Sequence, residues 1–240
     1  MVLEKLKNKS RIFYGSIIFI ITQLIAFIII HSSKGLTCSI TAFSSILLAF
    51  LFALIFLRKT PIYLLTVTAL FLTSIADLLL CGLFALTLSI QTASVICFFV
   101  VQICYFIRIY LSQKSKKLKL IHLIVRILAT LLAVIITILI LDSNANFLAV
   151  ISVAYYLNLI INAIFASINV KNEPLFFIGL LLFMLCDFFV GIEFLGDFIN
   201  IESATFINFL MDIPFNMAWL FYLPSQTIIS LDIANKKRTV

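Results

Sequence analysis

Residues 120–141 read LIHLIVRILATLLAVIITILIL, a stretch in which one histidine and one arginine interrupt an almost entirely apolar sequence. A helix rises about 1.5 Å per residue, so a segment of this length matches the ~30 Å hydrocarbon core of a bilayer. Similar segments recur along the chain at 12–30, 38–57, 61–83, 91–111, 120–141, 147–168, 174–195 and 212–231. The pattern predicts an all-α, polytopic transmembrane helix bundle of about eight spans, in which residues 1–240 form a single transmembrane domain.

The composition excludes an ordinary soluble domain. Hydrophobic residues make up 64% of the chain, against roughly 45–50% in soluble proteins, and only 11% of the residues are charged. The five cysteines lie within or at the ends of apolar segments, and no two are spaced as CxxC. Their odd number and placement favour buried thiols over a disulfide framework or a zinc site, and we expect neither a metal nor a cofactor.

The net charge of +7 is best explained by membrane topology. Basic residues gather at both chain ends and in every second connection, and Arg108 and Arg126 flank the 4–5 connection. Among the basic residues, Lys34 alone falls on the opposite side. The positive-inside rule then places both termini in the cytoplasm and requires an even number of spans. We therefore expect an integral protein of the bacterial plasma membrane, with membrane lipids as partners and no nucleic acid.

Two carboxylates lie well inside the predicted spans. Asp77 lies ~24 Å from Pro61 along its helix, and Asp187 lies ~20 Å from Pro174. Both therefore belong in the outer half of the bilayer at similar depth, where they could share one site. An acid inside a span costs about 2.5–3.5 kcal/mol even on lenient insertion scales, so it indicates function unless a structural partner accounts for it. Asp77 and Asp187 are the candidate catalytic residues.

Other polar side chains form stripes at helical spacing. Gln102 and Tyr105 are three residues apart, and Tyr222 and Gln226 are four apart, so each pair projects from one helix face. A third stripe in the sixth span consists of Tyr155, Asn158 and Asn162. We expect Asn158 and Asn162 to hydrogen-bond neighbouring helices. We expect the third, fourth, seventh and eighth spans to surround one polar site that contains both acids.

The order of these short motifs resembles the lysoplasmalogenase-like membrane family of YhhN type. That family has eight spans, with Gly-Asp in span three, Ala-His-x-x-Tyr in span four, Ser-Asp in span seven and Tyr-x-x-Ala-Gln in span eight. The corresponding stretches here are Ala76-Asp77, Val101-Gln102-Ile103-Cys104-Tyr105, Cys186-Asp187 and Tyr222-Leu223-Pro224-Ser225-Gln226. The resemblance covers most of residues 60–230, and its specificity comes from the order and spacing of the motifs.

The resemblance implies hydrolysis of the vinyl ether bond of a lysoplasmalogen, a lysophospholipid-type substrate. In that reaction one neutral Asp would donate a proton to carbon, and an ionised one would stabilise the resulting cation and orient water. The pair would be Asp77 and Asp187. The substrate-binding residues, which would hold the water or a glycerol oxygen, would be Gln102, Tyr105, Tyr222 and Gln226.

One departure from the family pattern leaves two alternatives open. The span-four histidine of the family is Gln102 here, and a glutamine cannot exchange a proton near neutral pH. A catalytically silent, lipid-binding homologue is therefore one alternative to a hydrolase. A transporter of ions or small solutes is the other, because intramembrane acids also mark transport pathways, although few Gly or Pro residues interrupt the spans.

Overall fold

The computed structural model describes residues 2–57, 60–142, 145–195 and 216–235, which form eight helices and no strand. The helices are α1 (Val2–Ser32), α2 (Leu36–Ile55), α3 (Pro61–Leu80), α4 (Leu88–Ser112), α5 (Lys116–Leu141), α6 (Phe147–Ser167), α7 (Pro174–Leu195) and α9 (Met217–Asn235). Seven of them, all except α9, are long and apolar enough to cross a membrane. The chain is therefore a polytopic helical membrane protein, as its composition predicts.

Caps and turns, rather than hydropathy, set the helix ends. α3 ends at Leu80 instead of residue 83, because Gly82 adopts the left-handed conformation with φ 78°. α4 begins at Leu88 instead of residue 91, where Thr87 Oγ1 accepts from the backbone N–H of Ile90 at 3.3 Å. Apolar patterning locates the membrane-embedded part of a helix, and the polar first turn extends beyond it.

The last helix begins later than its predicted span. Residue 212, where we expect that span to start, lies outside the described residues. The described helix α9 begins at Met217, and Asn216 Oδ1 accepts from the backbone N–H of Trp219 at 3.2 Å. The same helix contains Pro224 in its interior. It packs against α1, α2, α3 and α7, so protein surrounds much of it.

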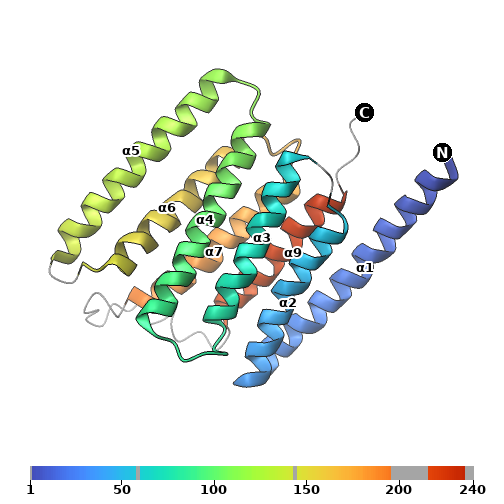
Figure 1. The fold of residues 1–240 in the computed structure, drawn as a ribbon, viewed down its shortest axis with the longest axis horizontal. Coiled ribbons are helices and arrows are strands. Elements are labelled where there is room, and N and C mark those ends of the chain that lie inside the picture. Colours follow the sequence, from blue (N-terminus) through green and yellow to red (C-terminus); the bar gives the residue numbers. More distant parts are fainter. Residues whose placement is uncertain (1, 58–59, 143–144, 196–215, 236–240) are drawn as a thin grey trace.

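The remaining helices pack around this interior. α3 packs on α4, α4 on α6, α7 on α9, and α6 on both α5 and α7. Figure 1 shows α1 and α5 at opposite edges of the bundle. Both expose apolar side chains along most of their length, including Leu24 on α1 and Leu139 on α5. These surfaces suit contact with lipid tails, and the polar side chains are left for the inside of the bundle.

The first residues of α1 and the last residues of α9 lie at the same end of the bundle (Figure 1). This arrangement agrees with an even number of crossings. By the positive-inside rule this end is cytoplasmic, an orientation that stays a prediction. The opposite end holds the carboxyl-terminal turn of α3 and the first turns of α4, α6 and α9.

Candidate functional site

Asp77 forms a pair with a tyrosine from the last helix. It lies on α3 near the end opposite the chain termini, and its side chain is buried. Tyr222, from the second turn of α9, donates its hydroxyl hydrogen to Asp77 Oδ2 at 2.6 Å. The two predicted site residues therefore meet directly, although 145 positions separate them in the sequence.

Asp187 on α7 forms a second pair of the same kind. Its Oδ2 accepts a hydrogen bond from the hydroxyl of Tyr155 on α6. The thiol of Cys186 also donates a hydrogen bond to this carboxyl group. Tyr155 is missing from the predicted site residues, because helical spacing groups it with Asn158 and Asn162 and gives no indication that α6 reaches Asp187.

A series of ring contacts connects the two pairs. Two phenylalanines bridge the pairs: the ring centroid of Phe183 lies 5.6 Å from that of Tyr222 and 6.0 Å from that of Phe98. Phe98 in turn lies 5.8 Å from Tyr155. Aromatic rings thus connect Tyr222, the partner of Asp77, with Tyr155, the partner of Asp187.

A second polar layer lies deeper in the bundle. Thr73 precedes Asp77 by one turn and Gln226 follows Tyr222 by one turn, and α3 and α9 run antiparallel, so both lie about 6 Å closer to the end that holds the termini. Gln102 and Tyr105 come from the interior face of α4. All four side chains are fully buried. The atoms without a hydrogen-bond partner are Thr73 Oγ1, Gln102 Nε2, the Tyr105 hydroxyl and both amide atoms of Gln226.

These unpartnered atoms have an energetic consequence. A buried polar atom that makes no hydrogen bond costs roughly 1–3 kcal/mol. Clusters of such atoms are commonly satisfied by water or by the polar part of a ligand. The unpartnered atoms on three of the predicted substrate-binding residues, Gln102, Tyr105 and Gln226, therefore suit oxygen-rich groups.

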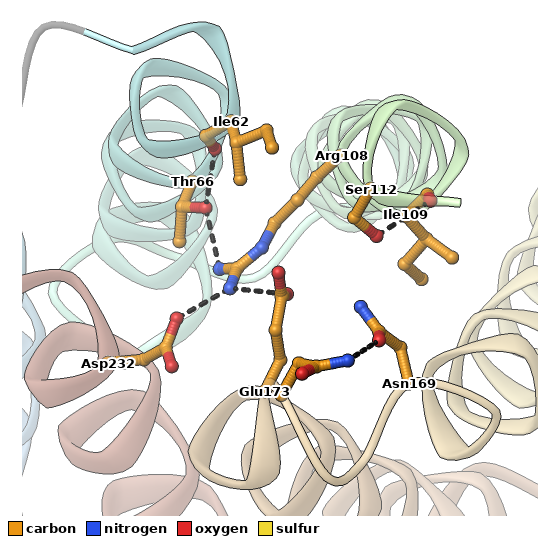
Figure 2. A network of polar contacts seen from close by, with 9 residues as sticks. Ile62, Thr66, Arg108, Ile109, Ser112, Asn169, Glu173 and Asp232 are labelled. Carbon is orange, nitrogen blue, oxygen red and sulfur yellow. Dashed lines mark hydrogen bonds and ion pairs between the residues drawn. The ribbon is translucent and has the colours of Figure 1, made fainter. Parts of the chain in front are cut away.

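A third cluster of polar side chains, which the sequence analysis did not predict, lies inside the bundle near the end that holds the chain termini. Figure 2 shows Arg108 of α4 at its centre. The guanidinium donates to Thr66 Oγ1 at 2.8 Å, to Glu173 Oε2 at 3.1 Å and to Asp232 Oδ2 at 2.5 Å. It also lies 3.5 Å from the ring centroid of Phe176. The network ties together α3, α4, α9 and the residue that precedes α7.

This network corrects the topological interpretation of Arg108. Its side chain is completely buried, whereas a positive-inside charge belongs in the cytoplasm. Two features of the sequence could have indicated it. Arg108 lies inside the predicted span 91–111, and Asp232 lies one residue past the predicted end of the last span, where a carboxylate also needs a partner.

Arg126 is likewise a bundle residue and not a surface charge. It is buried on α5, where it donates to the side-chain oxygens of Asn158 and Asn162. Its guanidinium also lies 4.4 Å from the Phe106 ring. Asn162 Nδ2 donates to the side-chain oxygen of Gln102 on α4, and Asn158 Nδ2 donates to Thr130 Oγ1 at 3.1 Å. The prediction that both asparagines hydrogen-bond neighbouring helices is confirmed.

A sequence model of the YhhN family matches residues 37–232 of the chain. The match runs from the first turn of α2 into the last turn of α9 and therefore includes both acid–tyrosine pairs and the Arg108 network. No curated protein and no solved structure matches the chain.

Proposed function

The chain belongs to the YhhN family, and from that premise we propose that it is a membrane-embedded hydrolase of lysoplasmalogenase type. The proposed reaction cleaves the vinyl ether bond of a lysoplasmalogen with one water molecule and releases a fatty aldehyde and a glycerophospho-base. The observation that carries the proposal is the pair of intramembrane carboxyl groups, the buried Asp77 and the partly buried Asp187, each held by one tyrosine hydroxyl inside an apolar bundle.

The chemistry needs an acid that acts on carbon and a base that acts on water. A proton is first transferred to the vinyl carbon that does not carry oxygen, which leaves an oxocarbenium ion. Water then adds to that cation and loses a proton, and the resulting hemiacetal collapses to an aldehyde and an alcohol. Two interacting carboxyl groups can hold one proton between them, so one donates while the other stabilises the cation and accepts the proton of water.

The tyrosines have a positioning role in this proposal. Each hydroxyl donates its only hydrogen to a carboxyl oxygen, which fixes the orientation of the acid. Phe98 and Phe183, whose rings lie between the two pairs, provide an apolar surface for the hydrocarbon chain of the lipid. The deeper layer of Gln102, Tyr105 and Gln226 would bind water or lipid oxygens.

The assay that tests the proposal offers the purified full-length protein a lysoplasmalogen in nanodiscs and measures fatty aldehyde. The matched control substrate is the saturated 1-alkyl lysophospholipid, which has no vinyl carbon to protonate. We expect aldehyde from the first lipid and none from the second. No aldehyde from either lipid would contradict the proposal.

Two further measurements separate the alternatives when aldehyde is absent. Binding of the saturated lipid without turnover would indicate a silent lipid-binding homologue. Movement of ions or small solutes into liposomes that contain the protein, but not into empty liposomes, would indicate a transporter.

A further inference from the structure

A chain of hydrogen bonds runs from α5 to the deeper polar layer and fixes the orientation of one amide. Arg126 Nη2 donates to Asn162 Oδ1 at 2.5 Å. Asn162 Nδ2 donates to Gln102 Oε1 at 3.0 Å and to the backbone oxygen of Gln102 at 2.9 Å. The Gln102 Nε2 group is buried and has no hydrogen-bond partner. Gln102 and Asn162 are both completely buried.

The direction of these bonds is dictated by chemistry. A guanidinium has five donors and no acceptor, so the oxygen of Asn162 must face Arg126. The Asn162 nitrogen then faces Gln102, which must accept with its oxygen. The N–H₂ group of Gln102 is consequently turned away from Asn162. We infer that Arg126 and Asn162 are positioning residues that make Gln102 offer a hydrogen-bond donor, and that this donor binds the ether oxygen of the lipid.

The choice of ether oxygen rests on the proposed function and on the surrounding charges. A neutral donor suits a neutral acceptor that has no hydrogen of its own. Both buried arginines are already occupied, Arg108 by two carboxylates and Arg126 by two amides. A phosphate group would therefore have to compete with these partners for either cation, whereas a neutral ether oxygen suits the amide donor of Gln102.

A histidine at position 102 would be oriented in the same way. Asn162 would donate to one ring nitrogen, so that nitrogen would have to be the unprotonated one. The N–H of the other nitrogen would face away from Asn162, as the Gln102 N–H₂ group does. The same hydrogen-bond chain would impose the same donor polarity on either residue, and only the histidine could pass its proton on.

The test reverses the direction of the hydrogen bond between residue 162 and Gln102 by replacing Asn162 with a residue that can only accept. In Asn162→Asp the new carboxylate satisfies Arg126 as well or better, and it can only accept from Gln102, so the glutamine amide must rotate. Asn158→Asp is the matched control, because Asn158 also accepts from Arg126 but donates to Thr130 and to the backbone of Ala154, not to Gln102. Both variants add one carboxylate beside the same arginine.

The first measurement needs no ligand. NMR spectra of the full-length protein, labelled with ¹⁵N-glutamine in nanodiscs, identify the Gln102 side-chain amide by its loss in Gln102→Glu. We expect a downfield shift of that amide proton in Asn162→Asp, where it bonds to a carboxylate, and little change in Asn158→Asp. No shift, or the same shift in both variants, would contradict the inferred orientation of the Gln102 side-chain amide.

The second measurement tests the acceptor. The affinity of a saturated 1-alkyl lysophospholipid is compared with that of the analogue in which a methylene replaces the ether oxygen. We expect the replacement to weaken binding by about three- to tenfold in wild type and Asn158→Asp, as for one neutral hydrogen bond, and not in Asn162→Asp. Equal discrimination in all three proteins would overturn the ether contact. If wild type binds neither lipid, the proposed function fails, whereas the NMR result still decides the orientation.

Discussion

Replacement of Arg108 with methionine should destabilise the bundle more than replacement of the other buried arginine. Arg108 is the cation that faces both Glu173 and Asp232, whose side chains are almost completely buried. The Arg108→Met variant removes the guanidinium from beside both carboxylates, which stay inside the protein. Removing one partner from a buried ion pair typically costs about 3–5 kcal/mol of unfolding free energy, and we expect a loss in that range.

Arg126→Met is the matched control for this experiment. Arg126 is also buried, but its partners Asn158 and Asn162 are neutral amides. Its removal leaves two amide oxygens without a donor and strands no charge. The expected loss is therefore smaller, about 1–3 kcal/mol.

The assay is reversible unfolding in mixed micelles of detergent and SDS, followed by tryptophan fluorescence or circular dichroism. A triple variant, Arg108→Met with Glu173→Gln and Asp232→Asn, also removes the two carboxylate charges and should recover at least half of the lost stability. The role assigned to Arg108 is refuted if Arg108→Met costs no more than Arg126→Met, or if the triple variant is as unstable as Arg108→Met alone.

Three further predictions concern topology and chemistry. In a cysteine-free background, Lys34→Cys should react with a membrane-impermeant thiol reagent added to intact cells, whereas Lys117→Cys should react only after permeabilisation; labelling of both from outside would contradict the orientation. Gln102→His should keep or raise the rate of aldehyde release, because an imidazole can share proton transfer; a variant that folds but loses activity would argue against this. In D₂O, with the aldehyde trapped as it forms, the product should carry one deuterium on the carbon next to the aldehyde group, and an unlabelled product would exclude protonation at carbon.

The helices and the candidate acids could be predicted from the sequence because their physical signals are local. Length and hydropathy identify a span, and Asp77 and Asp187 are conspicuous because a carboxylate inside a span is costly unless it has a partner or a function. The rise per residue also places the two acids at similar depth without any knowledge of the fold. These signals need only one helix at a time.

The partners of these groups could not be predicted, because they depend on which helices become neighbours. Periodicity places Tyr155 on the same face of α6 as Asn158. In the structure, however, the Tyr155 side chain contacts α7, whereas the Asn158 side chain contacts α5. Arg108 looks like a topological charge until Asp232 and Glu173 are brought to it from positions far along the chain. Contacts of this kind form only when the bundle is assembled.

The central claim is that Asp77 and Asp187 act together in hydrolysis of a vinyl ether. The measurement that tests it most directly is aldehyde release per folded molecule for wild type, Asp77→Asn and Asp187→Asn, with the folded fraction taken from gel filtration of each variant. Asparagine is nearly the same size and still polar, so it removes proton transfer without opening a cavity. We predict that wild type releases aldehyde and that each variant folds in nearly normal yield with turnover abolished. Turnover at the wild-type rate in either folded variant would contradict the claim.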